Sequence, residues 1–562
     1  MKKIITLLSI TMTTCFSVAF GQNKPKLILQ ITVDQLRGDM PFRVQDRWTE
    51  GGFQYLFDNG VWYANAHHPH AITETIVGHV TLATGATPGV HGMIGNSWFD
   101  YQEDRLVYNI EDENYTSTGG GSSRDADSEV DHSQVSKSEG RSPHNILTTT
   151  FSDEIASAFG TSSKIFAVSG KDRGAVSMAG HSGKAFWYST KDGSFASSTF
   201  YYEEFPQWVK DWNAKKQADE YKNTYWKLTD KIDNYRFGKE DDRPFENPSD
   251  LGFGKTFPHP YGEGKYYYTL LMASPAADDL TINFAKELIE KEDIGQDDVT
   301  DYLSISLSST DYIGHIFGPN SLESEENLLR LDQSLADLFS YIDQKVGLEN
   351  TLIVLSSDHG APESAQSLKQ KGFKVDVLDV SALDFSMVDK KLKEKYGIGK
   401  ELIKQNHVPY IYLDRKLIEE KGLDLDEVSK VIATELTNIE GIAYAITSTD
   451  IKNGNIADTP LTQRVLSNYN PKRSGDIYLV NEANWSLTID GDVALVNHGS
   501  PWRYDTFVPV IFAGNNLKKG KVYSEVSTVD VAITLSKYLN ILPPSGAEGT
   551  PLKEVLLQKD ND

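Results

Sequence analysis

The residues Lys26 to Asp34, KLILQITVD, form a β-rich apolar run that ends in a carboxylate. This pattern is typical of a buried strand. Two later runs have the same form, because a strand predicted over 302–307 leads to Asp311 and one predicted over 351–355 leads to Asp358. Helical patterns alternate with these strands. The sequence therefore predicts an α/β fold with a mostly parallel central sheet and helices on both faces.

Further strands are predicted over 61–64, 164–168 and 508–512, and helices over 52–59, 75–84, 322–346 and 529–539. The longest of these helices begins at Leu322, directly after Ser321, which can cap it. Its leucines recur at spacings of three and four residues, as expected of a helix with one buried face. The helix over 75–84 is expected to stop at Gly85.

The chain has 562 residues. At about 150 residues per domain this length allows three or four domains, but large α/β enzymes often form one decorated unit. We predict one catalytic domain over residues 22–562, with insertions at about 100–160, 186–290 and 364–471. The first insertion contains a long loop (100–141), and the second starts with a stretch rich in aromatic residues and lysine (186–226). The third has strands over 407–413 and 443–447 and a helix over 425–436, which predicts a small α+β subdomain.

Residues 1–21 have the pattern of a secretory signal peptide, because Lys2 and Lys3 precede an apolar segment and Gly21 completes a plausible cleavage site. A periplasmic protein is therefore expected. An uncleaved anchor is the alternative reading, and no other stretch reaches the length of a membrane span. The single cysteine, Cys15, lies within this segment, so no disulfide is expected in the mature chain. Whether Cys15 is lipidated stays open.

The excess of acidic over basic residues limits which classes of binding partner are expected. Asp and Glu number 80 against 55 Lys and Arg, a formal net charge of −25. A sequence-blind nucleic-acid binder needs a basic footprint, so nucleic-acid binding is not expected. An anionic small substrate is not excluded, because local cations can override the global field.

The carboxylates that follow three strands are candidate metal ligands, because ligands bind at the carboxyl ends of strands in open α/β sheets. Asp311 and His315 lie one helical turn apart, which suits a divalent metal. Asp358 and His359 form a second oxygen and nitrogen pair, and His498 lies in a tight turn. With Asp34 this makes three carboxylates and three imidazoles, about what two tetrahedral zinc sites need. Taken singly, each has an ordinary reading as a cap or turn residue.

Thr75, in Thr73-Glu74-Thr75-Ile76-Val77-Gly78-His79, is the candidate nucleophile. A hydroxyl at a helix start lies beside backbone N–H groups that attract an anion, and a metal ion would favour its alkoxide. The ordinary reading is an N-cap threonine, and Thr73 is the rival position. His79 and His91 are interpreted as structural.

The run Thr75 to Asn96, TIVGHVTLATGATPGVHGMIGN, resembles the nucleophile region of the alkaline phosphatase superfamily, most of all its nucleotide pyrophosphatase/phosphodiesterase branch. Seven residues occur in that branch's order and approximate spacing: Asp34, Thr75, Asp311, His315, Asp358, His359 and His498. Lys171-Asp172-Arg173 and Asn96 further resemble the phosphate-irrepressible, threonine-nucleophile alkaline phosphatases of bacterial periplasms. The resemblance covers most of the mature chain.

This resemblance implies an alkaline phosphatase that hydrolyses phosphate monoesters through a covalent phosphothreonine at a site with two Zn²⁺ ions. One zinc would be held by Asp311, His315 and His498, and the other by Asp34, Asp358, His359 and the Thr75 oxygen. Asn96, Lys171 and Arg173 would contact phosphoryl oxygens, for which Arg offers a planar fork and Lys a point charge.

Other functions stay open or are disfavoured. A nucleotide pyrophosphatase/phosphodiesterase would use the same metal site and is the main alternative. A sulfatase lacks support because the mature chain has no cysteine for a formylglycine, and the signal peptide disfavours a phosphomutase. A non-catalytic binding protein with a dead site is disfavoured because every expected ligand is present. The expected partners are small phosphate esters; a monomer is favoured, and the natural substrate range and the metal in vivo stay open.

Overall fold

The computed structural model is built around β1 (Leu27–Val33), in the middle of an 11-stranded sheet. It describes residues 24–119, 132–243, 246, 252–379, 383–488 and 496–556. The predicted signal peptide and Cys15 lie outside these ranges. The sheet order is β20 (Gly520–Val522), β2 (Gly60–His67), β19 (Phe507–Gly514), β12 (Thr351–Ser356), β1, β11 (Asp301–Leu307), β6 (Ile165–Ser169), β7 (Lys184–Tyr188), β8 (Phe195–Ser198) and β5 (Ser117–Thr118), and β21 (Val526–Ser527) pairs with β2.

The middle of this sheet is parallel, as predicted. Strands β12, β1, β11, β6 and β7 all run the same way, with Leu27 in register with both Asp301 and Thr351. Antiparallel pairs occur only toward the edges of the described sheet, where β19 joins β12 and β8 joins β7. The carboxyl ends of four neighbouring strands, β12, β1, β11 and β6, therefore meet along one edge.

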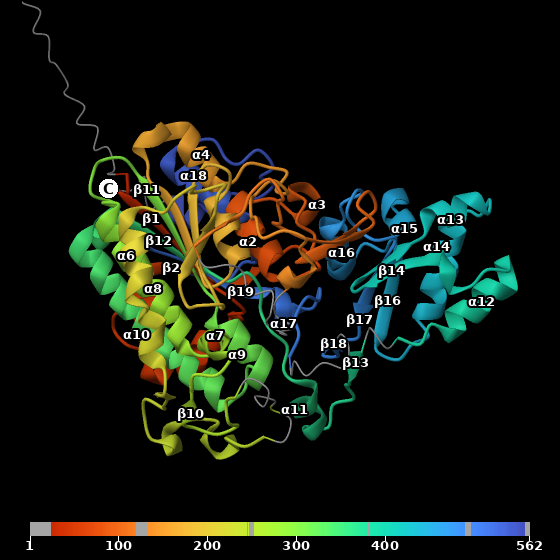
Figure 1. Cartoon of the computed structure of the whole chain (residues 1–562), viewed down its shortest axis with the longest axis horizontal. Coiled ribbons are helices and arrows are strands. Elements are labelled where there is room, and N and C mark those ends of the chain that lie inside the picture. Colours follow the sequence, from red (N-terminus) through yellow and green to blue (C-terminus); the bar gives the residue numbers. More distant parts are fainter. Residues whose placement is uncertain are drawn as a thin grey trace, which may run out of the picture.

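Helices cover both faces of the sheet (Figure 1). On β1, Leu29 and Ile31 join the core under α8 (Pro275–Lys291) and α10 (Leu322–Lys345), while Ile28 joins the opposite core. That opposite core is covered by α2 (Thr75–Thr84), α4 (Phe151–Phe159), α5 (Asp172–Ala179) and α18 (Asp530–Leu539). Alternate residues of a strand point to opposite faces, so a strand that is apolar throughout can serve two cores.

The predicted helix ends agree with the structure. The Ser321 hydroxyl accepts a hydrogen bond from Ser324 N at 3.0 Å at the start of α10. Helix α2 ends at Gly85, which adopts the left-handed conformation with φ 65°. The remaining helices are α1 (Phe53–Asn59), α3 (Pro88–His91), α6 (Gln207–Lys215), α7 (Tyr267–Met272), α9 (Ser309–Phe317), α11 (Ala365–Gln370), α17 (Arg503–Thr506) and α19 (Lys553–Leu556).

Three details differ from the sequence-based expectations. The strand predicted over 407–413 is a hairpin of β14 (Ile403–His407) and β15 (Tyr410–Leu413), because Pro409 fixes its own φ and has no N–H for a ladder. The stretch predicted as a long loop contains β4 (Arg105–Tyr108), which pairs with β3 (Ser97–Asp100). The aromatic stretch from residue 186 begins inside β7, because Phe186 is a core residue of the central sheet.

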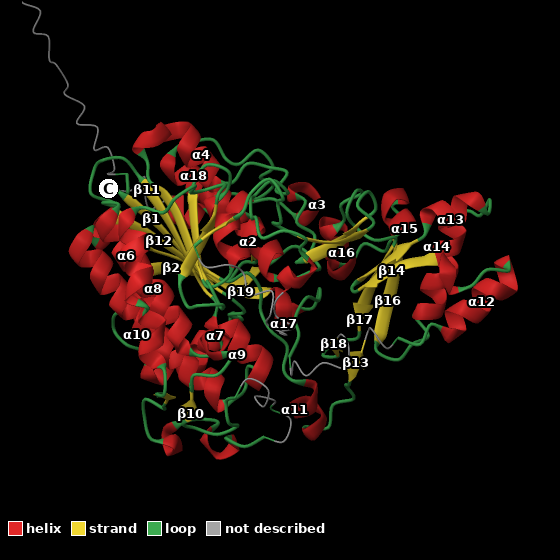
Figure 2. Ribbon diagram, viewed as in Figure 1, coloured by secondary structure: helices red, strands yellow, loops and turns green. Residues whose placement is uncertain are grey.

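A second sheet lies apart from the first and has its own core (Figure 2). Its order is β14, β15, β17 (Ile477–Asn481) and β16 (Ile442–Thr447), with α12 (Ser386–Tyr396) and α14 (Leu425–Leu436) packed on it. Strand β17 lies beyond residue 471 in sequence. Helices α13 (Arg415–Glu420), α15 (Ser448–Asn453) and α16 (Pro460–Asn468) complete this part, and two short pairs are β9 (Tyr225–Trp226) with β10 (His259–Pro260) and β13 (Val377–Asp379) with β18 (Ser486–Thr488).

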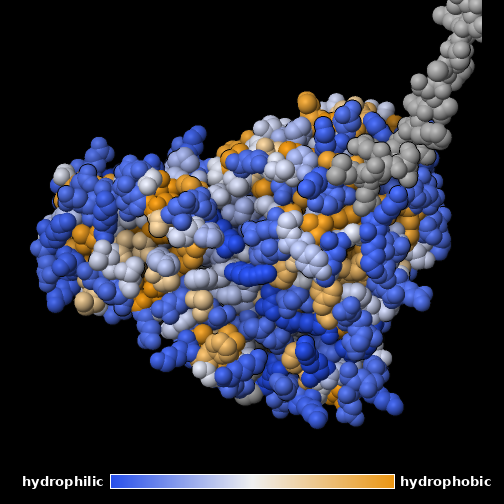
Figure 3. Space-filling model, turned by 180° about the vertical axis from the view of Figure 1, so that it is seen from behind, coloured by the Kyte–Doolittle hydropathy of each residue, from blue (hydrophilic) through white to orange (hydrophobic). Residues whose placement is uncertain are grey.

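The face of the molecule shown in Figure 3 is mostly hydrophilic, with hydrophobic residues in patches between hydrophilic ones. Over the described ranges, no helix combines the length and the apolar character that a membrane span requires.

Candidate active site

The order of the strands brings the predicted site residues together. Asp34 follows β1 directly, Asp358 comes two residues after β12, and Asp311 lies in the first turn of α9, just beyond β11. Lys171 comes two residues after β6, the next strand in the sheet. Neighbouring parallel strands end at the same edge, so these four side chains meet although they are far apart in sequence.

Asp311, His315 and His498 form a first cluster, in which the ligand-capable atoms all lie within 4.8 Å of one another. Asp311 Oδ1 is 3.2 Å from His315 Nε2 and 3.4 Å from His498 Nε2. One carboxylate oxygen therefore faces two imidazole nitrogens around a common point.

Asp34, Asp358 and His359 form a second cluster under the same limit. His359 Nε2 is 3.3 Å from Asp34 Oδ1 and 3.6 Å from Asp358 Oδ2. All three side chains are fully buried. The rings of His359 and His498 stack with centroids 3.6 Å apart, so the two clusters adjoin.

The three imidazoles share one arrangement. Each Nδ1 faces a backbone carbonyl oxygen, at 2.7 Å for His315 and Val496, 3.0 Å for His359 and Gly360, and 2.7 Å for His498 and Thr73. A carbonyl can only accept, so this network assigns a proton to each Nδ1 and leaves each Nε2 directed at the clusters. Burial lowers the pKa of His498 to about 3, which keeps its ring neutral.

The buried polar atoms of the second cluster fit a cation. Asp34 Oδ1, Asp358 Oδ2 and His359 Nε2 are buried and have no hydrogen-bond partner within the described chain. Burial raises the pKa of Asp34, and the negative charges of Asp311 and Asp358 raise it further. Such a concentration of buried negative charge is costly unless cations offset it. Mixed carboxylate and imidazole donors are ligands that divalent transition metals accept.

Thr75 is the first residue of α2, and its hydroxyl faces two cationic side chains. Thr75 Oγ1 is 3.5 Å from Lys171 Nζ and 3.3 Å from Arg173 Nη2. Lys171 Nζ also lies 2.6 Å from Asp34 Oδ2 and 2.5 Å from Asp311 Oδ2, so one ammonium group touches both clusters. The charges of these two carboxylates outweigh burial and raise the pKa of Lys171 above its ordinary value, so it stays protonated.

Asn96 lies against the first turn of α2, where it contacts Ile76, the residue next to Thr75 in sequence. Its side-chain Oδ1 accepts a hydrogen bond from Ile76 N at 3.3 Å, which assigns the two Nδ2 donors to the opposite side of the amide. Its backbone N donates to Glu74 Oε2 at 2.5 Å. Glu74 therefore helps to place Asn96, a contact that the sequence analysis did not anticipate.

Comparison with known proteins assigns the family. A model of the type I phosphodiesterase / nucleotide pyrophosphatase family matches residues 28–501. The chain belongs to this family. It is 35% identical over 544 residues to alkaline phosphatase PafA of Elizabethkingia meningoseptica, with 95% of each chain covered. It is 34% identical over 539 residues to alkaline phosphatase PhoV of Synechococcus elongatus, with 95% of this chain and 93% of PhoV covered.

The fold comparison agrees. The crystal structure of wild-type PafA matches with a TM-score of 0.85 at 33% sequence identity, covering 95% of this chain and 99% of that one. The expected alkaline phosphatase-like fold and the membership of that superfamily are thereby confirmed.

Three residues close to Thr75 in sequence, Thr73, Gly78 and His79, make contacts that bear on how the site is arranged. A Cβ on Gly78 would lie 1.9 Å from the carbonyl oxygen of Asp358, so only glycine lets α2 pack this closely. His79, interpreted as structural, bonds the Thr75 carbonyl through Nδ1 at 2.8 Å and lies 3.2 Å from Asp358 Oδ2. Thr73, the rival nucleophile, donates its hydroxyl to Ser500 O at 3.0 Å, whereas the Lys171 ammonium contacts the hydroxyl of Thr75.

Two further residues that contact the predicted site, Gln35 and Tyr312, were not predicted from the sequence. Gln35 contacts both Asp311 and Asp358, and the Lys171 ammonium lies 5.2 Å from the ring centroid of Tyr312. Each directly follows a predicted ligand in sequence, which is the signal that could have identified them.

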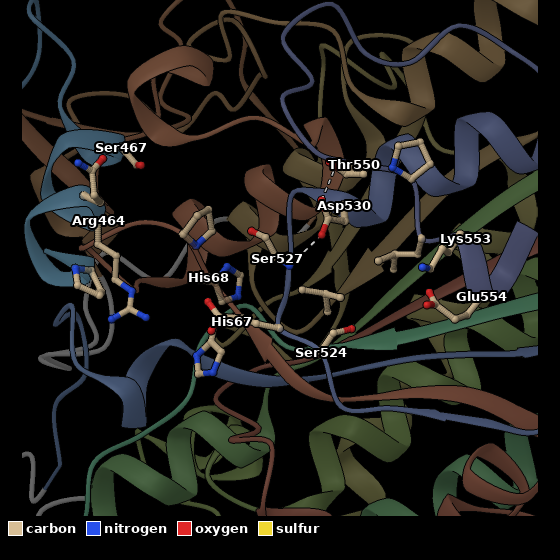
Figure 4. Close-up of a pocket in the computed structure, with 17 residues that line it drawn as sticks. His67, His68, Arg464, Ser467, Ser524, Ser527, Asp530, Thr550, Lys553 and Glu554 are labelled. Atoms are coloured by element: carbon tan, nitrogen blue, oxygen red, sulfur yellow. Dashed lines mark hydrogen bonds between the residues drawn. The ribbon is translucent and has the colours of Figure 1, made fainter. Parts of the chain in front are cut away.

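A cavity of about 730 Å³ lies elsewhere, between α16 and the segment 524–554 (Figure 4). Its lining within the described chain includes none of the predicted site residues. His68, at its base, contacts the carbonyl of Ser357 and the hydroxyl of Thr528 through its two ring nitrogens, each at 2.9 Å. Arg464, Asp530 and Glu554 give the lining mixed charge.

Proposed function

We propose that this chain is a periplasmic alkaline phosphatase that hydrolyses phosphate monoesters through a phosphothreonine formed at Thr75. The observation that carries the proposal is the pairing of one buried hydroxyl with two buried cations, since Lys171 Nζ and Arg173 Nη2 both lie within 3.5 Å of Thr75 Oγ1. The relatives named alkaline phosphatase, at 34–35% identity, support it.

The proposed metal ligands are the two clusters. Asp311, His315 and His498 would hold one Zn²⁺, and Asp34, Asp358, His359 and Thr75 Oγ1 would hold the other. When bound, two zinc ions would supply Lewis acidity toward the phosphoryl and hydroxyl oxygens and offset the charge of the three carboxylates. Zinc is proposed because the donors are carboxylate and imidazole groups.

The side chains then act on the phosphoryl group. Lys171, Arg173 and Asn96 hold its non-bridging oxygens and orient phosphorus toward Thr75 Oγ1. The threonine oxygen attacks in line, a Thr–O–P bond forms and the bond to the ester oxygen breaks. The ester oxygen leaves as the alcohol, which takes up the proton that the Thr75 hydroxyl gives up. Water then cleaves the Thr–O–P bond, which releases inorganic phosphate and restores the hydroxyl. The transition state of phosphoryl transfer is loose, so most of the catalytic effect comes from positioning and charge.

The proposed preference for a monoester rests on the two cationic side chains beside Thr75. A phosphate monoester dianion has one more charged oxygen than a diester, and Lys171 and Arg173 can meet that charge. Arg173 Nε is buried and lacks a hydrogen-bond partner in the described structure, so the guanidinium retains a donor. The alternative, a nucleotide pyrophosphatase or phosphodiesterase, is favoured by the description of the family model.

Kinetics on two synthetic substrates separate the two candidates. Purified protein with added zinc is assayed with p-nitrophenyl phosphate and with bis-p-nitrophenyl phosphate. The proposal expects kcat/KM to be higher for the monoester by orders of magnitude. A preference for the diester would replace it with the phosphodiesterase assignment.

The location is proposed from residues 1–21. Export through this segment implies that the mature protein starts near Gln22. N-terminal sequencing of protein recovered from the periplasmic fraction tests this, and full-length protein that stays in the cytoplasm would contradict it.

A further inference from the structure

Gln35 hydrogen-bonds to one carboxylate in each cluster. It follows Asp34, a member of the second cluster, and is itself 1% exposed. Its side-chain Nε2 donates to Asp311 Oδ1 at 2.7 Å, and its backbone N donates to Asp358 Oδ1 at 3.1 Å. Two bonds from one residue therefore reach the segments that follow β11 and β12, the strands on either side of β1.

The side-chain bond fixes how Asp311 is turned. Asp311 Oδ1 is the oxygen that faces the Nε2 atoms of His315 and His498, while Oδ2 faces Lys171. A carboxylate that accepts no other bond can rotate about its last torsion, which is broad for Asp. In Asp311 the Lys171 ammonium bonds Oδ2 and the Gln35 amide bonds Oδ1, so the two bonds together remove this freedom and hold Oδ1 toward the imidazoles.

The backbone bond has a conformational cost. Gln35 has φ 64°, in the left-handed region that residues other than glycine rarely adopt. This conformation points the Gln35 N–H at Asp358 Oδ1, which also accepts a bond from His359 N at 3.0 Å. With Oδ1 occupied in this way, Asp358 Oδ2 faces the interior of the second cluster. Strain retained beside a reaction centre is typical of a functional constraint.

Helix α9 makes room for the Gln35 side chain. Gly314 lies between Asp311 and His315 on this helix, and a Cβ there would lie 1.9 Å from Gln35 Oε1. Because glycine inside a helix is otherwise unfavourable relative to alanine, its presence here is explained by this close approach.

We propose that Gln35 is a positioning residue that presets both ion sites, with its side chain serving the first cluster and its backbone N–H the second. The proposal rests on the proposed function, in which these clusters hold zinc. It predicts an asymmetric effect. Loss of the side chain lowers the zinc affinity of the first cluster. The zinc affinity of the second cluster stays close to its original value.

Zinc affinity measured by competition with a chromophoric chelator tests this without an activity assay. Gln35→Gly removes the side chain while keeping a residue that accepts φ 64° at no steric cost. Gly314→Ala leaves residue 35 unchanged but takes the space of its amide. Gln30→Glu is the matched control, because Gln30 is a buried glutamine in β1 whose Oε1 accepts from the Tyr302 hydroxyl at 2.9 Å, outside the two clusters. Gln30→Leu, which removes this bond, is the harsher form of the same control.

The wild type should bind two zinc ions per chain, and the Gln30 control variants should bind each ion with the affinity that the wild type shows for it. Gln35→Gly should lose about 10–100-fold in affinity for one ion only, the range known for residues that orient metal ligands. In crystals of Gln35→Gly grown at limiting zinc, the anomalous signal should be weaker at the site of Asp311, His315 and His498 than at the site of Asp34, Asp358 and His359. Gly314→Ala should behave the same way, and if it does not fold, Gln35→Gly alone decides.

Equal zinc affinities for Gln35→Gly and the wild type, or equal weakening of both ions, would overturn the role given to Gln35. Failure of the wild type itself to bind two zinc ions would instead overturn the proposed function, so the two failures are distinguishable.

Discussion

Arg173 Nη2 lies 3.3 Å from Thr75 Oγ1, and Nε of the same buried guanidinium has no hydrogen-bond partner in the described part of the chain. A cation buried beside a hydroxyl, with a donor to spare, is suited to an anion that joins the two. Asp172, the neighbour of Arg173, is paired with Arg141 at 2.8 Å and with the Tyr108 hydroxyl at 2.7 Å. The carboxylate next to Arg173 in sequence is therefore occupied elsewhere.

Replacing both cations tests the substrate preference. Lys171→Ala combined with Arg173→Ala should lower monoesterase kcat/KM by orders of magnitude and spare much of the diesterase activity, because a diester lacks the extra charged oxygen that these groups meet. Lys164→Ala is the matched control, since Lys164 precedes the same strand β6 at the opposite edge of the sheet. Equal losses on both substrates would count against the assigned role.

Thr75 is tested by removing and by restoring its hydroxyl. Thr75→Ala should abolish turnover while zinc stays bound, because six other ligand side chains remain. Thr75→Ser keeps the hydroxyl at the start of α2 and should retain turnover. Kinetics and zinc content measured on the same samples check this, and unchanged turnover in Thr75→Ala would refute the nucleophile.

Gly78 tests the packing that places the nucleophile. In Gly78→Ala the new Cβ meets the Asp358 carbonyl at 1.9 Å, so α2 and the second cluster must move apart. Overpacking of this kind costs about 1–3 kcal/mol of stability, and a displaced Thr75 should lower kcat as well. Gly264→Ala is the control, because no atom of the described residues lies within 4 Å of its Cβ position. A stable, fully active Gly78→Ala variant would show that this contact is not needed.

A buried carboxyl away from the site makes stability depend on pH. Burial, and next the charge of Asp241, raise the pKa of Glu323 from 4.5 to about 8, and its Oε1 lies 3.2 Å from His259 Nε2. The folded protein then holds a proton that the unfolded chain releases above pH 4.5, so this stabilising contribution is lost as pH rises to about 8.

Glu323→Gln should flatten that dependence, because an amide has no proton to release. The free energy of unfolding, measured with urea from pH 5 to 8, should fall less steeply in the variant, by up to about 1 kcal/mol per pH unit. Glu246, whose pKa burial and the charge of Glu323 also raise to about 8, keeps part of the slope. Parallel curves for the two proteins would remove Glu323 as the cause.

The positions of Asp34 and Asp358 at the ends of strands could be predicted, because the apolar run before each residue is a local feature of the sequence. Apolar runs before Asp34 and Asp358 predicted buried strands, and parallel strands place such residues along one edge. Lys171 could have been placed in the same way, since it follows the predicted strand over 164–168. The resemblance to a known family then supplied the roles, which no spacing alone could.

Other features depend on tertiary contacts. The positive φ of Gln35 arises because its N–H must reach Asp358, which is more than three hundred residues away in sequence. The contact of Glu74 with Asn96 likewise depends on how the chain folds back after α2. The hairpin at Pro409 was missed because its strands are short and β14, with the sequence IKQNH, is mostly polar.

A crystal structure of zinc-loaded protein with inorganic phosphate bound tests the central claim most directly. The account predicts one zinc ion against Asp311, His315 and His498 and another against Asp34, Asp358 and His359. It also predicts a phosphate beside Thr75 that contacts Asn96, Lys171 and Arg173. Clusters without ions in a fully loaded sample, or phosphate bound away from Thr75, would contradict it.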